Sequence, residues 1–388
     1  LVGCGGRGTG AAINFIESGN GLTVTALGDV FADKLANCRK LLQEKGVVVA
    51  DENCFLGFDA YKQVIDSDVD VVLLCAPPVF RPSHFEYTVA KGKHAFLEKP
   101  CAVDPVGARQ MLVLGKQAEQ KRLSVISGTI RRSQKDCIET YRRVAEGAIG
   151  DIVSAHASRM GGALWFVERR PEWDDMEYML RNWVNFCWTS GDLVVEQFIH
   201  EIDMISWFMG DKKPVRAEAT GGRQQRITGD QYDFFSIEYL YENGLRAHCT
   251  SRQIAGCDNL HSVMVYGTKG YTNCFNKIYN LDGSLAWEYP YPIADDEDQS
   301  MVVPDPYEQE IIRLVTAIRT DKPVNDTELH VQSTLMAIMG RESAYTGKFV
   351  TWDEMLTSPQ KLGPETYAFG PVPGIKEEIP RAGVAPER

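Results

Sequence analysis

The residues Gly3-Cys4-Gly5-Gly6-Arg7-Gly8 follow the pattern G-x-G-x-x-G, which constrains the fold of this chain more than any other feature. The pattern follows the apolar pair Leu1-Val2 and precedes a stretch of helical character. An acid, Asp29, comes 21 residues after Gly8 and follows an apolar run over residues 22–27. This order of strand, glycine-rich turn, helix, strand and acid is the fingerprint of a dinucleotide-binding Rossmann unit.

The glycines and the acid have separate roles in such a site. Gly3 makes the tight turn, Gly5 lets the backbone approach a pyrophosphate, and Gly8 lets the helix pack close to the strand. The free N–H groups and the dipole at the helix N-terminus then favour the pyrophosphate charge. The carboxylate of Asp29 accepts hydrogen bonds from ribose hydroxyls and repels a 2′-phosphate, and residues 30–32 contain no arginine. We therefore predict NAD rather than NADP, with an incidental glycine-rich loop as the alternative.

Composition narrows the class of protein. A length of 388 residues indicates two or three domains. The chain is 44% apolar, and its best apolar run, Val71–Ala76, is far shorter than the about 20 residues that cross a bilayer. The net charge is −12 and lysines and arginines do not cluster. We therefore expect neither nucleic-acid binding nor membrane insertion.

The number and spacing of the cysteines indicate the redox environment in which the protein folds. Ten cysteines are scattered without C-x-x-C spacing, so zinc ribbons and thioredoxin-type chemistry lack support. Free thiols in apolar runs favour folding under reducing conditions, which predicts a cytoplasmic location. The apolar pair Leu1-Val2 is short for a strand, so we also expect an upstream segment that would carry any export signal.

The chain divides into three predicted parts: residues 1–130, 131–358 and 359–388. In the first part, apolar runs at 22–27, 71–76, 94–97 and 123–126 alternate with helical stretches, which predicts an α/β Rossmann domain with a parallel sheet.

The second part is rich in strands, and Asn243-Gly244 marks a hairpin between two alternating runs. We predict an α+β domain with a large, mostly antiparallel open sheet, which serves substrate binding and oligomerisation. The third part is a proline-rich C-terminal arm that we expect to pack across a neighbouring subunit of a homodimer or homotetramer.

Four segments carry a resemblance to a known family. They are Ala76-Pro77-Pro78 followed by His84, Gly92-Lys93-His94, Glu98-Lys99-Pro100, and the segment from Gly191-Asp192 through His200-Glu201-Ile202-Asp203. In this order they resemble the Gfo/Idh/MocA (glucose–fructose oxidoreductase / inositol dehydrogenase) family over essentially the whole chain. Further segments, such as Arg131-Arg132-Ser133-Gln134 and Ser251-Arg252-Gln253, resemble a sugar-acting bacterial branch. Many members of that branch carry a twin-arginine export signal, so a periplasmic location is the alternative.

The resemblance implies residues that contact NAD in the loops after the first-domain strands. These cofactor-binding candidates are Gly3, Gly5, Gly6, Arg7, Gly8, Asp29, Pro77, Pro78, His84, Glu98 and Lys99.

The resemblance also implies three catalytic residues, Lys99, Glu196 and His200. Oxidation of a sugar alcohol needs a hydride acceptor, a base for the hydroxyl proton and a donor that stabilises the developing alkoxide. Nicotinamide, His200 and Lys99 meet these needs in turn. An imidazole base predicts rates that rise through one apparent pKa in the neutral region. Glu196 stands where many family members have Asp, and it either orients His200 or binds a substrate hydroxyl.

Spacing predicts how two of these residues meet. Glu196 and His200 lie four residues apart in a predicted helix over 194–210, so we expect them on one helix face. Asp203 lies on that side too, where it either serves the site or anchors the helix. A structural buried histidine is the alternative for His200.

Four residues are candidates for substrate contact: Asp203, Arg132, Trp183 and Arg252. Sugar faces stack on aromatic rings, so Trp165 and Trp188 are further candidates, with packing in the core as the alternative. As the alternative, Arg132 and Arg252 each form an ion pair at an interface rather than contact the substrate. The spacing of Glu196 and His200 is not that of di-iron sites, and the chain has no His-Glu-x-x-His, so we predict no metal.

These features predict an NAD-dependent oxidoreductase that takes hydride from a secondary alcohol of a sugar or glycoside. The resemblance implies the 3-hydroxyl as one candidate position, which would give a 3-keto sugar. The first alternative is a redox-neutral, NAD-dependent glycoside hydrolase that would use the same residues. The second alternative is a non-catalytic NAD-binding regulator, against which the joint presence of Lys99 and His200 argues.

Overall fold

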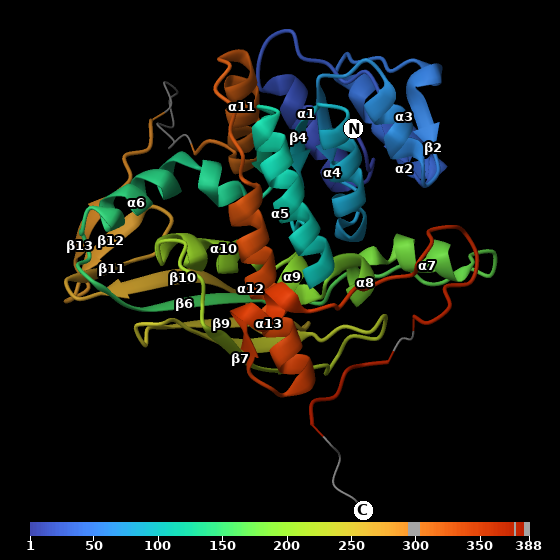
Figure 1. Ribbon diagram of the computed structural model, residues 1–388. Helices are drawn as coiled ribbons and strands as arrows, with labels where there is room; N and C mark the ends of the chain where they lie inside the picture. The colour runs from blue at the N-terminus through green and yellow to red at the C-terminus, as the bar shows by residue number, and fades with distance from the viewer. Residues whose placement is uncertain (294–302, 376–377, 384–388) are drawn as a thin grey trace, which may run out of the picture.

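The first domain follows the predicted alternation of strands and helices. The computed structural model describes residues 1–293, 303–375 and 378–383 (Figure 1). The strands of this domain are β1 (Leu27–Asp29), β2 (Cys54–Leu56), β3 (Val71–Leu74), β4 (His94–Leu97) and β5 (Val125–Ser127). Its helices are α1 (Gly6–Glu17), α2 (Ala32–Glu44), α3 (Ala60–Asp66), α4 (Arg81–Ala90) and α5 (Pro105–Gln120), with short 3-10 turns at η1 (Asp51–Asn53) and η2 (Pro78–Phe80).

All strand pairs of this domain are parallel, as predicted for a Rossmann fold. Val2 joins the two groups of strands, because it bridges Gly28 on one side and Leu74 on the other. The predicted strand over 22–27 lies further along the chain, at Leu27–Asp29. The reason is that its pairing partners, Val2 and Cys54–Leu56, lie opposite those residues.

The second domain contains a nine-stranded sheet in the order β13-β12-β11-β10-β6-β9-β8-β7-β14. Among the described pairs of this sheet, only β6 and β9 run parallel, which confirms a mostly antiparallel sheet. Its strands are β6 (Ile152–Gly161), β7 (Arg216–Gly222), β8 (Phe234–Leu240), β9 (Arg246–Gln253), β10 (Leu260–Gly267), β11 (Gly270–Thr272), β12 (Lys277–Asn280), β13 (Leu285–Glu288) and β14 (Val350–Thr351). The Asn243-Gly244 turn joins β8 to β9, as predicted.

Helices cover one face of this sheet. The helices after residue 130 are α6 (Lys135–Ala145), α7 (Asp175–Arg181), α8 (Cys187–Ser190), α9 (Leu193–Glu196), α10 (Ile199–Phe208), α11 (Pro306–Arg319), α12 (Thr327–Thr346) and α13 (Trp352–Thr357), with 3-10 turns at η3 (Ile130–Ser133) and η4 (Trp183–Asn185). Of these, α9, α10, α12 and α13 contact strands of the sheet. Figure 1 shows α12 between the two domains, and it contacts both α5 and β7. Residues of α10 and α12 share one buried apolar cluster with the inward side chains of the strands, which fixes α10 against the first domain.

Helix α11 returns to the first domain although it follows the sheet in sequence. Its Ile311 and Leu314 are buried in one cluster with Phe15 of α1 and Ile126 of β5. The chain therefore crosses between the domains more than once. Within the described residues, no helix is both long and apolar enough to span a bilayer.

The described part of the C-terminal arm packs on α7, α8 and the second domain of its own chain. Val372 is buried beside Met176 and Leu180, and the Met176 N–H donates to the Gly370 carbonyl at 3.1 Å. The Tyr232 hydroxyl donates to the carbonyl of Pro380 at 2.9 Å. Figure 1 shows the arm running along α7 and α8. Residues 376–377 and 384–388 of the predicted arm lie outside the described residues.

Candidate active site

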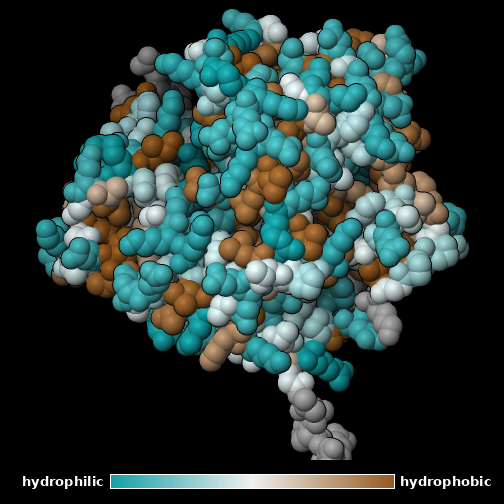
Figure 2. Space-filling model, in the orientation of Figure 1, coloured by the Kyte–Doolittle hydropathy of each residue, from teal (hydrophilic) through white to brown (hydrophobic). Residues whose placement is uncertain are grey.

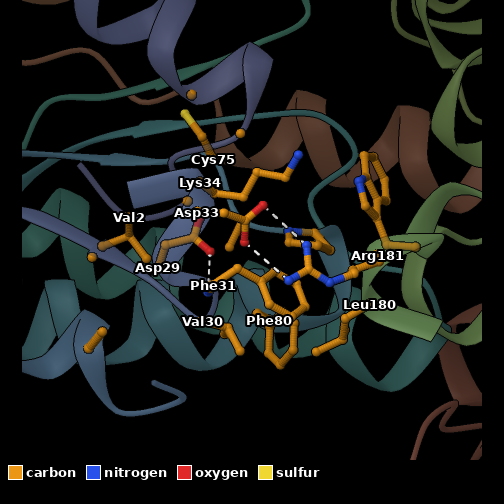
Figure 3. A pocket seen from close by; sticks show the side chains of 18 of the residues that line it. Val2, Asp29, Val30, Phe31, Asp33, Lys34, Cys75, Phe80, Leu180 and Arg181 are labelled. Atoms are coloured by element: carbon orange, nitrogen blue, oxygen red, sulfur yellow. Dashed lines mark hydrogen bonds and ion pairs between the residues drawn. The ribbon is translucent and has the colours of Figure 1, made fainter. Parts of the chain in front are cut away.

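A cavity of about 730 Å³ opens at the carboxyl ends of β1 and β3, where ligands bind in open α/β sheets. Its first-domain wall is the glycine loop together with Asp29, Phe31, Phe58 and Phe80. Its second-domain wall comes from a segment between β6 and η4, including Trp165, Trp173, Leu180, Arg181 and Trp183. Figure 3 shows side chains from both walls pointing toward one another.

The glycine loop leaves room for a dinucleotide. A Cβ on Gly8 would lie 1.8 Å from the Gly3 carbonyl oxygen, and a Cβ on Gly3, where φ is +91°, would lie 2.4 Å from the Ala76 nitrogen. These two glycines are needed for close packing. A Cβ on Gly5 or Gly6 would meet nothing within 4 Å, so open space lies above the N-terminus of α1. The residues present therefore fit a pyrophosphate.

Asp29 lies at the end of β1 and lines the same cavity. Its carboxylate accepts hydrogen bonds from the backbone N–H groups of Cys4 at 2.6 Å and Phe31 at 2.8 Å, which fix its orientation. Burial raises the pKa of this carboxyl, and the backbone donors oppose that rise. A carboxylate held here fits the predicted ribose contact.

The predicted cofactor residues after β3 divide into two kinds. Pro77 and His84 line the cavity, whereas Pro78 is buried at the start of η2. The His84 ring stacks against Tyr61 at 4.2 Å and Phe80 at 5.7 Å between ring centres. Burial, helped by Arg81, lowers the pKa of His84 to about 3, so this imidazole is uncharged at neutral pH.

Arg7 connects the cavity to the predicted catalytic residue Lys99 through Glu98. Its guanidinium donates to the carboxylate of Glu98 and, at 3.2 Å, to Glu310 of α11. Glu310 is fully buried, and burial together with the charge of Glu98 raises its pKa well above the usual range. Glu98 in turn accepts the Lys99 backbone N–H at 3.0 Å. Sequence reasoning missed Glu310, because nothing local marks a partner so distant in the chain.

Lys99 lies two residues past β4 and meets Glu196 from the second domain. Its Nζ donates to the Glu196 carboxylate at 2.7 Å and to the Glu196 carbonyl at 2.5 Å. Only 15% of the Lys99 side chain and 10% of the Glu196 side chain are exposed. The Lys99–Pro100 peptide bond is cis. The structure therefore brings Lys99 and Glu196 together, although neither is among the residues that line the cavity.

The predicted continuous helix over 194–210 is wrong. Helix α9 ends at Glu196 and α10 begins at Ile199, so Glu196 and His200 do not share one helix face. The Leu193 carbonyl accepts from both Gln197 and Phe198, which widens the turn. The Glu196 carbonyl at this break accepts from Lys99. The Lys99 side chain from the first domain thus takes the place of a backbone N–H as donor to the Glu196 carbonyl. The apolar periodicity of the sequence cannot show such a long-range contact.

His200 lies just after this break, at the start of α10. Its Nδ1 is buried and has no hydrogen-bond partner among the described residues. Burial, and then the positive charge of Lys99, hold the pKa of His200 well below its usual range. The imidazole is therefore neutral at neutral pH, as a proton acceptor must be. This moves the predicted rise of the rate from the neutral region to acid pH.

Two predicted substrate residues, Arg132 and Asp203, instead form a buried ion pair. Arg132 Nε donates to both Asp203 oxygens at 2.9 Å, its Nη2 donates to Asp211 at 2.7 Å, and Ser333 donates to Asp203 at 2.5 Å. Only 8% of the Arg132 side chain and 1% of the Asp203 side chain are exposed. These contacts anchor α10 to η3 and α12, and they leave neither side chain free for a substrate.

Arg252, another predicted substrate residue, lies on the face of the sheet opposite the helices. Side chains alternate along β9, and Ser251 and Gln253 are buried toward the helices while Arg252 points to the open face. Gln253 Nε2 donates at 2.7 Å to Gln197, the residue after Glu196. Gln253 therefore lies on the side of the candidate site, and the alternation of β9 could have identified it.

Of the three tryptophans predicted as substrate contacts, two line the cavity and one is buried in the core. Trp165 and Trp183 line the cavity. Trp188 is 2% exposed and packs on Tyr367 of the C-terminal arm, so it belongs to the core. Among the residues that the structure describes, no three His, Cys, Asp or Glu side chains are grouped as a metal would need.

Together, the fold and the cavity define a two-domain NAD-binding oxidoreductase. The model of the oxidoreductase family with an NAD-binding Rossmann fold matches residues 1–127, and the GFO/IDH/MocA C-terminal domain model matches residues 138–273. The chain belongs to the Gfo/Idh/MocA family, and NAD is the cofactor of its first domain.

Known proteins support the same architecture. Inositol 2-dehydrogenase of Rhizobium meliloti is 23% identical over 207 residues, which are 53% of this chain and 56% of that protein. The structure of myo-inositol 2-dehydrogenase from Lactobacillus plantarum matches with a TM-score of 0.65 at 20% identity, covering 90% of this chain and 97% of that chain. The WlbA dehydrogenase from Bordetella pertussis, solved with NADH and UDP-GlcNAcA, matches with a TM-score of 0.67 at 17% identity and the same coverages. At these identities, the structural matches show the fold.

Proposed function

We propose that this protein oxidises a secondary alcohol of a sugar, cyclic polyol or glycoside with NAD. The observation that carries the proposal is the contact of Lys99 with Glu196 across the domain boundary, beside a neutral His200. The proposal is supported by the position of Lys99 just past β4, and by the bonds through which Glu98 and Arg7 link this lysine to the cofactor cavity.

Each residue then has one task. His200 takes the proton of the hydroxyl, since its unprotonated form is the stable one at neutral pH. The Lys99 ammonium stabilises the negative charge that develops on the same oxygen. Glu196 fixes the direction of the ammonium through two hydrogen bonds, which makes it a positioning residue. NAD, when bound, supplies the hydride acceptor.

The 3-hydroxyl, whose oxidation gives a 3-keto sugar, is one candidate position within this proposal. A 3-keto group acidifies the neighbouring C–H, so the same residues would also serve the redox-neutral hydrolysis of a glycoside. The relative that is an inositol 2-dehydrogenase supports the dehydrogenase.

One screen tests the proposal. Inositols, free sugars and nitrophenyl glycosides are offered with and without added NAD, while NADH absorbance and released nitrophenol are followed together. Net NADH formation supports the dehydrogenase, and nitrophenol release without net NADH supports the hydrolase. Turnover of none of these compounds by a protein that binds NAD would favour the regulator.

Self-association and location are part of the proposal. The open face of the sheet exposes apolar side chains such as Phe234 and Leu260, and a second copy of the chain would cover them. Light scattering that gives a monomer mass would contradict this. All ten cysteines, which lie within residues 1–293, carry free thiols, in keeping with a cytoplasmic location. Fractionation that recovers the protein from the periplasm would contradict it.

A further inference from the structure

The cavity has a second wall that the glycine motif does not supply. Residues after β6, from Trp165 to Trp183, face the first domain across the cavity and contribute Val167, Arg170 and Trp173 to its lining. Residues 162–170 of this segment form no helix or strand, and α7 follows it. A dinucleotide held by the glycine loop would therefore be enclosed from two sides.

Arg181, at the end of α7, makes the closest link between the two walls. Its guanidinium donates to the Asp33 carboxylate at 3.1 and 3.2 Å, and its Nε donates to Glu177 at 2.8 Å. The guanidinium carbon lies 4.1 Å from the centre of the Phe31 ring and 5.0 Å from that of Trp173. Figure 3 shows Arg181 reaching over Phe31 toward Asp33.

The position of this link identifies the part of the cofactor that it faces. Phe31 and Asp33 follow Asp29, the residue that contacts the adenosine ribose in a Rossmann site. Lys99 follows a different strand, β4, and meets Glu196 rather than the cavity wall. Arg181 therefore lies at the adenosine end of the cavity, away from the catalytic residues.

The C-terminal arm contacts both walls at this end of the cavity. The Phe369 ring lies 5.3 Å from Phe58 and 6.2 Å from Phe31, measured between ring centres. The neighbouring Gly370 carbonyl accepts from Met176 of α7 at 3.1 Å. The arm thus contacts both sides of the adenosine end, which holds α7 in place against α2.

We propose that Arg181 and Trp173 complete the adenosine site from the second domain and retain bound NAD. Release of NAD then requires the Arg181–Asp33 pair to open and the guanidinium to leave the Phe31 ring. The proposal goes beyond the proposed function and depends on NAD binding alone, not on the alcohol. A retained cofactor suits the redox-neutral alternative, in which NAD ends each cycle in the form in which it began.

The test measures NAD release without any substrate. The full chain is loaded with radiolabelled NAD and diluted into excess unlabelled NAD, and the label that stays on the protein is followed in time. Arg181→Ala should release label about tenfold faster than wild type, since one exposed ion pair and one cation–π contact are together worth about 1.4 kcal/mol. Asp33→Asn should give a smaller increase. The matched control is Arg142→Ala, which removes an arginine that bonds two glutamates on the distant α6.

Melting curves establish that each variant folds. If Arg181→Ala does not fold, Asp33→Asn carries the test, because 57% of the Asp33 side chain is exposed and the substitution removes the charge that pairs with Arg181. Release rates of the folded variants within twofold of wild type would overturn the proposal. Unchanged NAD release with a raised KM for the alcohol would place Arg181 in the substrate site and would also overturn it. Failure of the proposed oxidation leaves this measurement unaffected.

Discussion

The two halves of the candidate site are built in different ways. The cofactor half is made of backbone: glycines without side chains, the N-terminus of α1, and an Asp29 held by backbone N–H groups. The catalytic half is made of buried charged side chains that find partners far away in the sequence, as Lys99 finds Glu196. Shape therefore governs the first half and electrostatics governs the second. Substitutions in the cofactor half should therefore change stability and NAD affinity, whereas substitutions in the catalytic half should change kcat.

The largest expected effect is in the catalytic half. Lys99→Ala should lower kcat by about 10²–10³-fold, the usual cost of losing a donor to a developing oxyanion. NAD affinity should stay within about twofold, because Lys99 does not line the cavity. Initial rates and a fluorescence titration with NAD measure the two quantities. Lys277→Ala removes a more exposed lysine–glutamate pair outside the candidate site, Lys277 with Glu288, and should leave both quantities unchanged.

The cofactor half should respond to volume. Gly8→Ala places a Cβ 1.8 Å from the Gly3 carbonyl, so the loop must move, at a cost of about 1–3 kcal/mol in the free energy of unfolding. Gly6→Ala meets nothing within 4 Å, and that variant should melt like wild type while binding NAD more weakly. Equal melting temperatures for the two variants would show that shape does not govern this half.

Acid pH should lower the stability of the protein through its buried histidines. His84 and His330 have pKa values lowered to about 3, and His200 also lies well below its usual range, all through burial. Below about pH 6.5 these histidines bind a proton in the unfolded state but not in the folded state, so acid favours unfolding. Each such histidine lowers the free energy of unfolding by about 1.4 kcal/mol per pH unit, down to its folded pKa. The free energy of unfolding from urea titrations should therefore fall between pH 6.5 and 4.

Activity should follow a different course with pH. Because the His200 base is neutral well below pH 6.5, kcat/KM should be level from about pH 6.5 to 8 and fall only in acid. A rate that rises through a pKa near 7 would mean that the proton acceptor is not a buried imidazole. Rates taken at pH values where the protein stays folded decide the matter.

The smallest expected effect lies outside both halves. Arg252→Ala should change kcat/KM by less than about twofold, because Arg252 points to the open face of the sheet and bonds only the Asp258 carbonyl among the described residues. Gln253→Ala, one residue along the same strand, should have the larger effect, since it contacts Gln197 beside Glu196. Equal effects would show that the alternation of β9 does not select the functional face.

The sequence predicted well what depends on neighbours in the chain. Helix α1 follows the glycine-rich turn as predicted, and the Asn243-Gly244 hairpin forms where its turn residues stand. Asp29 lies in the cavity because a motif fixes its distance from the glycine loop.

Long-range partners could not be predicted in this way. Nothing near Arg132 indicates that Asp203 neutralises it, and nothing near Arg7 points to Glu310. The break between α9 and α10 depends on a lysine from another domain, so local periodicity continues through it. The burial of His200 lowers its pKa, and burial is a property of the packed protein rather than of the residue.

The most direct test of the account is a crystal structure of the protein with NAD and a poorly reactive alcohol. We predict that the alcohol oxygen lies within hydrogen-bond distance, about 2.6–3.2 Å, of both Lys99 Nζ and a His200 ring nitrogen, with its carbon facing the nicotinamide ring. A structure in which NAD fills the cavity but the alcohol oxygen contacts neither side chain would contradict it.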